Sequence, residues 1–421
     1  MAVAVVAAVA LIAGGLSFWS RIITPIDPSV VDAHPNRKAP WTADGVVLWE
    51  GTEGGLSVGD RVVAVEGRSM QYWGDRLFDP YAKRPNIAVD ATLIYQVERN
   101  GELRNVPVTL RPYPLASTLV AHWSLVLLIV VQLGLTAFVF IRRPDNSAAR
   151  AALLLASLAA WAAPWWLGPH LQIIDLVMAT GFWRYVAGEI SDALVLAALL
   201  YFVLIFPRPG KVLSHHRWLA GLVYAAPFVL HGIWLVMVVP AASDTLERAR
   251  LFASPIVLTK VGYPIVVIAA LIFGYRSTSD TVSRQQLRWL AVTLGAGLSL
   301  YVIFWLVPEV VIGHPLLSKG YRFAVFLPVP FATAAAILRY RAFGIDIVNR
   351  ALVSMFLATC LVIVFEIVAG LLGMLIEKEV GFLISLLITA VVTPFVIEPL
   401  REWIQRIVNR LLDNSCSEVP K

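Results

Sequence analysis

The chain has 421 residues, of which 58% are hydrophobic and only 15% charged, and its net charge is +6. Apolar segments of about twenty residues, the length that crosses roughly 30 Å of hydrocarbon, recur along the sequence. This excludes an ordinary water-soluble protein and predicts an integral membrane protein with the lipid bilayer as its surroundings. The Lys and Arg residues lie mainly in short loops rather than on one continuous face, so nucleic acid is not an expected partner.

Ten segments are predicted to span the membrane, and they follow one another along almost the whole chain. They are residues 2–19, 117–141, 151–167, 187–206, 219–239, 256–275, 289–311, 323–338, 351–376 and 380–397. The predicted fold is therefore mainly α, a polytopic bundle of about ten transmembrane helices. Residues 114–398 carry nine of these spans, and a small β-rich domain follows the first span.

The first apolar segment, within residues 1–20, is predicted to be an uncleaved transmembrane anchor. A cleaved signal peptide is the alternative. No basic residue precedes the segment and no clear small-residue cleavage site follows it, which favours the anchor.

Basic residues indicate the orientation of the bundle. They cluster in loops that begin near Arg142, Arg208, Arg276, Arg339 and Arg401. If the spans alternate, these loops all lie on one side, which the positive-inside rule places in the cytoplasm. The β-rich domain is then extracytoplasmic and the C-terminus cytoplasmic.

Residues 21–113 are polar enough to form a water-exposed domain, and their pattern is typical of short strands. Apolar runs at 45–49 and 61–67 flank a glycine-rich turn at 54–60. The pair Asn100-Gly101 predicts a type I′ hairpin between residues 91–99 and 102–110.

The turn and the strand after it resemble a PDZ domain. The residues that carry the resemblance are Gly55, Leu56, Gly59, Asp60 and Gly67. The resemblance implies a sheet edge that binds an extended peptide. The glycine-rich loop that would capture a peptide carboxylate is missing, so protein docking and a ligand-free spacer both remain open.

Two C-terminal stretches resemble the membrane half of bacterial sensor histidine kinases. Residues 336–350, Ala-Ile-Leu-Arg-Tyr-Arg-Ala-Phe-Gly-Ile-Asp-Ile-Val-Asn-Arg, resemble a junction between two spans of that family, and residues 399–410 resemble its cytoplasmic exit helix. Together with the anchor, the PDZ-like domain and the later spans, they resemble the input half of quorum-sensing kinases of the competence-pheromone type. The resemblance implies a place in the bacterial cytoplasmic (inner) membrane and a role in two-component signal transduction.

Residues 399–421 are predicted to be a cytoplasmic amphipathic helix and tail. Leu400, Ile404, Ile407 and Leu411 are spaced as in a coiled-coil seam, which predicts pairing with a second copy in a homodimer. A helix lying on the anionic inner leaflet is the alternative reading. No phosphoacceptor histidine or ATP-binding segment is recognisable, so a separate cytoplasmic kinase is the expected partner.

The sequence gives no sign of catalysis. It lacks the His-Glu-x-x-His pattern of zinc proteases, a Gly-x-Ser-x-Gly elbow and a phosphate-binding loop. Its two cysteines lie far apart and have no metal-binding spacing. We therefore expect no enzyme activity, no cofactor and no metal.

Charged residues inside predicted spans are the candidate ligand-binding residues, because an ionisable group at mid-membrane costs at least about 2.5–3.5 kcal/mol. Glu366 lies in the ninth span, and Glu189 and Asp192 lie near the outer end of the fourth, just after Trp183 and Arg184. The tryptophans at the outer end of the third span would complete an outward-facing pocket; they are Trp161, Trp165 and Trp166. Interfacial aromatic residues and neutral or paired carboxylates are the simpler explanation.

These observations predict a non-catalytic membrane sensor or receptor module. An extracellular peptide or a membrane protein would change the packing of the spans, and the exit helix would pass the change to a cytoplasmic partner. A structural or scaffolding subunit of a larger membrane complex is the alternative. A transporter is less favoured, because neither an inverted repeat nor a pair of Gly/Pro-broken spans is evident.

Overall fold

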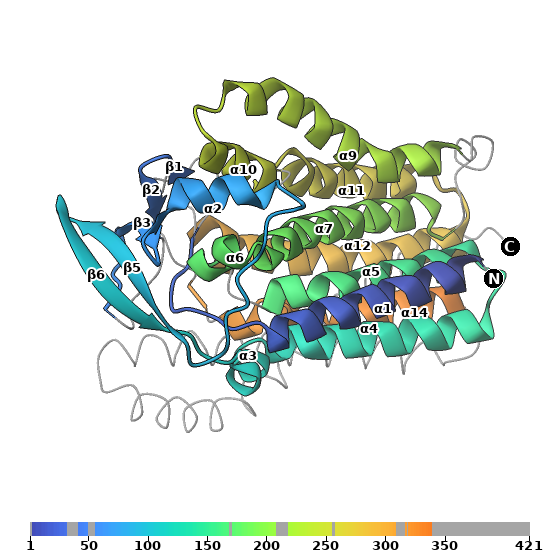
Figure 1. Ribbon diagram of the computed structural model, residues 1–421. Coiled ribbons are helices and arrows are strands. Elements are labelled where there is room, and N and C mark those ends of the chain that lie inside the picture. Colours follow the sequence, from blue (N-terminus) through green and yellow to red (C-terminus); the bar gives the residue numbers. More distant parts are fainter. Residues whose placement is uncertain are drawn as a thin grey trace, which may run out of the picture. The chain divides into compact units, whose positions relative to one another are not determined.

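The computed structural model describes residues 2–31, 41–48, 55–167, 171–207, 218–254, 257–308, 316–317 and 319–338. Figure 1 shows their helices and strands, labelled in chain order. The chain divides into two compact units. The first unit is Met1–Leu119 with Arg150–Ala270, and the second is Val120–Ala149 with Leu271–Lys421. The predicted spans 351–376 and 380–397, Glu366 and the exit-helix seam lie outside the described residues.

Long apolar helices dominate the described chain, consistent with a multi-pass membrane protein. Six helical segments among the described residues are long and apolar enough to cross a membrane. They are Ala2–Ile23, Trp123–Arg142, Ser147–Leu167, Thr180–Ile205, Trp218–Ala241 and Thr281–Trp305. Two shorter apolar helices cover Gly262–Ser277 and Ala324–Leu338. Every predicted span in the described chain is thus largely helical, while the total of ten stays a prediction.

The first unit contains four of these six long helices, most of a shorter apolar helix and the whole sheet. The helices are α1 (Ala2–Ile23), α5 (Ser147–Leu167), α7 (Thr180–Ile205), α9 (Trp218–Val238, extended by the 3₁₀ turn η1, Val239–Ala241) and most of α11 (Val257–Ser277). Helix α3 (Leu115–Ala121) follows the sheet domain. Only 6% of the residues in the membrane-length stretch of α9 are buried, as expected for a helix in contact with lipid.

Within the described residues, the sheet is antiparallel and has six strands. They are β1 (Trp41–Thr42), β2 (Gly45–Val47), β3 (Arg61–Val65), β4 (Arg68–Ser69), β5 (Thr92–Arg99) and β6 (Glu102–Thr109). The strand order is β1-β2-β3-β5-β6, and β4 pairs with β3. The predicted hairpin is confirmed: Arg99 pairs with Glu102, and Asn100 and Gly101 have φ values of 55° and 82°.

The predicted turn before β3 is also present, and its last residue is held by an ion pair. The Asp60 carboxylate accepts the backbone N–H of Ser57 at 2.8 Å and two hydrogen bonds from the Arg99 guanidinium at 2.7 Å each. Gly55 and Gly59 both have φ of 86°, which favours glycine. The turn and the small antiparallel sheet are therefore observed, whereas a PDZ identity remains a prediction.

Short helices join the sheet to the long helices. They are α2 (Met70–Leu77), α6 (Ile173–Met178) and α10 (Thr245–Ala253). Ser69 and Asp244 cap α2 and α10 by accepting backbone N–H groups at 3.2 and 2.8 Å. The Asp244 side chain also accepts the N–H of Ala43 next to β1 at 2.9 Å.

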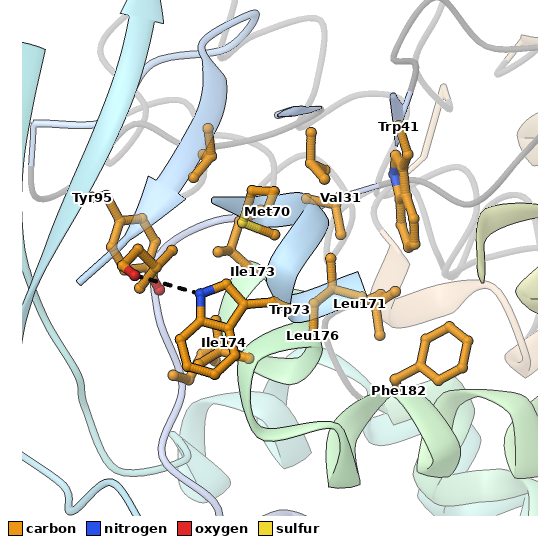
Figure 2. Close-up of a cluster of buried hydrophobic side chains, with 14 of the residues drawn as sticks. Val31, Trp41, Met70, Trp73, Tyr95, Leu171, Ile173, Ile174, Leu176 and Phe182 are labelled. Atoms are coloured by element: carbon orange, nitrogen blue, oxygen red, sulfur yellow. Dashed lines mark hydrogen bonds between the residues drawn. The ribbon is translucent and has the colours of Figure 1, made fainter. Parts of the chain in front are cut away.

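One continuous hydrophobic core runs from the sheet into these helices and the start of α7. Figure 2 shows side chains from β5 (Tyr95), α2 (Met70, Trp73), α6 (Ile173, Ile174) and α7 (Phe182) gathered in it. The Trp73 indole N–H donates to the carbonyl of Val65 at 3.4 Å. The sheet therefore shares one hydrophobic core with α2, α6, α10 and the start of α7 and is not connected to them by a flexible linker alone.

The second unit is built on α4 (Trp123–Arg142), α12 (Thr281–Tyr301) and α14 (Pro328–Leu338). The π-helical turn η2 (Val302–Leu306) continues α12, and the 3₁₀ turns η3 (Lys319–Tyr321) and η4 (Ala324–Phe326) precede α14. Both α4 and α12 pack against α14. The buried Gln286 side chain donates to the carbonyl of Ala336, which joins α12 to α14.

Candidate ligand-binding pocket

A buried ion pair joins the end of α1 to α6. The Arg21 guanidinium lies 3.3 Å from Oδ1 of Asp175, and the two side chains are only 6% and 4% exposed. Arg21 ends an apolar helix and would normally turn to solvent. It is buried because Asp175 and Gln172, whose Oε1 accepts from Arg21 at 3.1 Å, supply acceptors inside the first unit.

Arg184 of α7 binds the same carboxylate oxygen from the other side. Its Nη2 lies 3.1 Å from Oδ1 of Asp175, and its Nη1 donates to the Thr24 hydroxyl at 3.3 Å. Gly181 makes this approach possible, because a Cβ at that position would lie 1.9 Å from the Asp175 oxygen. Three segments, α1, α6 and α7, therefore converge on one carboxylate.

The carboxylate of Asp175 is held in place by the start of its own helix. Its Oδ2 accepts the backbone N–H of Gln172 at 3.1 Å in a capping box. The Gln172 amide in turn donates to the carbonyl of Asp27 at 2.6 Å. Gln172 thus links the arginine pair to the segment that leads into the sheet domain.

Asp27 forms the second half of this network. Its carboxylate accepts hydrogen bonds from the backbone and hydroxyl of Ser29, from the Tyr95 hydroxyl at 2.8 Å and from the Ile174 backbone at 2.8 Å. Burial raises the pKa of Asp27 above its ordinary value, although these hydrogen bonds act in the opposite direction. Burial, together with the Asp27 charge, also raises the pKa of Tyr95 well above its ordinary value. The network therefore extends from β5 to the ends of α1 and α7.

A cavity of about 40 Å³ lies beside the arginine pair. Four helices or their flanking residues line it: α1, α5, α6 and α7. The lining residues are Ser17, Arg21, Trp161, Pro164, Trp165, Leu171, Asp175, Gly181, Arg184, Tyr185, Ala187, Gly188 and Ser191. A water molecule needs roughly 10–15 Å³ of such space, so the cavity accommodates a small polar group and not a whole drug-sized ligand.

Some of the residues singled out from the sequence meet at this cavity. Arg184, Trp161 and Trp165 line it. Trp183 packs elsewhere: its indole donates to the carbonyl of Leu77 at 3.2 Å, and its ring lies against Phe78.

The two carboxylates of α7 also lie outside the lining. Asp192 accepts a hydrogen bond from the Trp166 indole at 3.2 Å. Glu189 is buried but does not line the cavity. Gly181, Arg184, Gly188 and Ser191 line the cavity and recur on one face of α7.

Sequence reasoning missed the residues at the centre of the site: Arg21, Asp27, Tyr95, Gln172 and Asp175. Two local signals were available. Gln172 and Asp175 have capping-box spacing, and Asp27-Pro28-Ser29 has the composition of an Asx turn. Neither signal reveals that the two motifs meet.

Metal ligands do not gather in the described part of the chain, where no three His, Cys, Asp or Glu side chains lie close enough to hold an ion. The site's chemistry, as far as its described residues go, consists of guanidinium donors, one shared carboxylate and aromatic walls.

Comparison of the chain with protein-family models, with curated proteins and with solved structures finds no match. The class that the described structure defines is a mainly helical protein with several membrane-length apolar helices and a small antiparallel sheet.

Proposed function

We propose that the protein is a non-catalytic membrane sensor or receptor module that passes an extracellular signal to a separate cytoplasmic partner. One observation carries the proposal: the hydrogen-bonded network from Tyr95 through Asp27, Gln172 and Asp175 to Arg21 and Arg184. It couples the sheet domain to α1 and α7 by buried contacts.

This network acts as a rigid joint between the sheet domain and the ends of α1 and α7, so a displacement of the sheet domain also moves these helix ends. Breaking a buried ion pair by removing one partner typically costs about 3–5 kcal/mol, so the sheet domain and the helix ends move together. The continuous core of β5, α2, α6 and α7 acts in the same direction. A ligand that shifts the sheet domain therefore biases the arrangement of α1 against α7.

The cytoplasmic part of the proposed signalling route is inferred from the sequence. The basic loops favour a sheet domain outside a bacterial cytoplasmic membrane. The seam Leu400–Leu411 is the predicted helix that would pair in a homodimer and contact a cytoplasmic kinase. This arrangement corresponds to the input half of a quorum-sensing kinase.

Cysteine crosslinking tests the proposal. Cys360 and Cys416 are replaced by serine, and a single cysteine is placed at Glu402, off the predicted seam. Crosslinking between two copies is then measured in membranes with and without conditioned medium. We expect the medium to change the yield, and we expect a Gln172→Ala variant to lose that change while it still crosslinks. An unchanged yield under every condition would contradict a signalling role.

A structural subunit of a larger membrane complex is the second candidate, because the same rigid joint suits a scaffold. The apolar surface of α9, of which few residues are buried, would then contact partner helices instead of lipid. Purification in a mild detergent separates the two candidates, since stoichiometric recovery with one large complex favours the subunit.

A further inference from the structure

The ionisable residues that line the cavity carry unbalanced charge. Arg21 and Arg184 contribute two positive charges against the single negative charge of Asp175, which leaves a formal net charge of +1 at the lining. Both arginines bind the same oxygen of Asp175, and its other oxygen accepts the backbone of Gln172. The shared carboxylate therefore balances only one of the two guanidinium charges.

The nearby carboxylates of Asp27 and Glu189 do not line the cavity and so do not neutralise the net positive charge of its lining. Asp27 is directed toward Ser29, Tyr95 and the Ile174 backbone, and it does not line the cavity. Glu189 lies on α7 but outside the lining. An anion in the cavity would be the direct partner of the two guanidinium groups.

The guanidinium groups of Arg21 and Arg184 have further N–H donors that can bind such an anion. Each carries five N–H donors in a planar fork that suits carboxylate and phosphate oxygens. Arg21 uses two of its donors, toward Asp175 and Gln172. Arg184 uses one toward Asp175 and its Nη1 toward Thr24 and the carbonyl of Ser20. Both side chains border the cavity, where further oxygens can be bound.

The remaining walls indicate where the anion comes from. Trp161 and Trp165 lie near the end of α5, and Tyr185 lies near the start of α7, both membrane-length helices. Tryptophan and tyrosine at span ends mark the depth of lipid headgroups. A cavity of about 40 Å³ takes the oxygens of one headgroup phosphate, while the acyl chains stay along the exposed apolar helix surfaces.

We propose that this cavity binds a phosphate oxyanion, supplied by the headgroup of an anionic phospholipid, through Arg21 and Arg184 between walls of tryptophan and tyrosine. The inference rests on the proposed function for its consequence: a lipid bound there occupies the joint through which the sheet domain acts on α1 and α7. Free inorganic phosphate is the other source of the same chemistry.

The test uses the full chain, delipidated in dodecyl maltoside. Native mass spectrometry measures binding of phosphatidylglycerol and of diglucosyldiacylglycerol, which has matched acyl chains and no phosphate, and thermal unfolding is followed with added sodium phosphate. Preferential binding of phosphatidylglycerol supports the proposal. If sodium phosphate also raises the unfolding temperature, the site binds both free phosphate and the lipid headgroup. If it does not, the site binds only the lipid. Equal binding of the two lipids, or binding of neither, overturns the proposal.

Variants locate the binding. Arg184→Gln weakens phosphatidylglycerol binding about tenfold or more, because a hydrogen-bonded charge pair is lost. Asp175→Asn removes the competing carboxylate, so added phosphate raises its unfolding temperature by more than it raises that of the wild type.

Both of these substitutions also break the ion pair between Arg184 and Asp175, so a third variant leaves it intact. Ala187 is exposed and lines the cavity, and Ala187→Phe fills the cavity with little disturbance of the core. Ile190→Phe, on the same helix but outside the lining, is the matched control. We expect the first to lose phosphatidylglycerol binding and the second to retain it. Wild-type binding by Ala187→Phe would place the lipid elsewhere and overturn the proposal.

The two proposals fail in different ways. Lipid binding in detergent requires no signalling, and the crosslinking response requires no lipid in this cavity. Loss of preferential lipid binding with an intact crosslinking response removes only the lipid site, and the converse result removes only the sensor function.

Discussion

The Tyr95 hydroxyl of β5 donates a hydrogen bond to Oδ2 of Asp27 at 2.8 Å, which ties the sheet to the segment that leaves the first long helix. Both side chains are almost completely buried, and the second oxygen of Asp27 accepts from Ser29. This hydrogen bond therefore ties the covalent entry of the sheet domain, at Asp27, to the middle of β5.

Replacing Tyr95 with phenylalanine removes this donor and leaves the ring in place. We expect the unfolding free energy to fall by about 1–3 kcal/mol, because the buried carboxylate loses one of its partners. Thermal unfolding of the detergent-solubilised protein measures the change. The control is Tyr72→Phe, whose hydroxyl accepts only the exposed Arg68 side chain and whose loss should change stability by less than about 0.5 kcal/mol. Equal effects of the two substitutions would show that Asp27 does not depend on Tyr95.

Asp27 should make the protein less stable as the pH rises from acid. Burial raises its pKa in the folded state, so above pH 3.8 the unfolded chain loses the proton while the folded chain keeps it. Stability therefore declines from about pH 3.8 up to the raised folded pKa and is constant beyond it. Asp27→Asn should flatten this part of the pH profile of the unfolding temperature. An identical slope in the variant would assign the pH dependence to other groups.

Asp60 should have the opposite effect. Partial burial disfavours its charge, but the hydrogen bonds and charge of Arg99 outweigh this and lower the pKa of Asp60 in the folded state. Its stabilising contribution is complete above pH 3.8 and is lost as the pH falls through the lowered folded pKa. Asp60→Asn should lower stability at pH 7 and reduce the further loss at acidic pH. Arg61→Gln, which breaks the more exposed pair with Glu98, is the control and should have little effect at either pH.

Local signals were sufficient for several elements. Asn100-Gly101 specifies its own hairpin because both residues tolerate positive φ, and the apolar length of α1 or α7 is enough to predict a membrane-length helix. Helix α6 gave no such signal, since six residues are too few to show a helical period. The helix was therefore not predicted, although it lies between the predicted spans 151–167 and 187–206 and carries Asp175.

The candidate site was only partly predictable for a related reason. Arg184 and the tryptophans of α5 stood out because charge and aromatic rings are unusual within spans. Arg21 did not, because a basic residue after an apolar segment is normally a flanking charge. Its partner Asp175 lies 154 residues further along, and one sequence contains no information about such a pairing.

The geometry of Gly181 supplies the sharpest test of the ion network. A Cβ there would lie 1.9 Å from Oδ1 of Asp175, so Gly181→Ala must displace the carboxylate that Arg21 and Arg184 share. We expect a loss of about 3–5 kcal/mol in the unfolding free energy, the typical effect of breaking a buried ion pair.

The matched control is Gly221→Ala on α9, where the new methyl group meets no atom within 4 Å. Alanine is a better helix former than glycine by roughly 1 kcal/mol, so this substitution should leave stability unchanged or raise it. Thermal unfolding of both variants gives the comparison. Because the two substitutions are chemically identical and both lie in helices, opposite signs would isolate the close contact at Asp175 as the cause, and equal signs would show that the carboxylate relaxes without loss of the network.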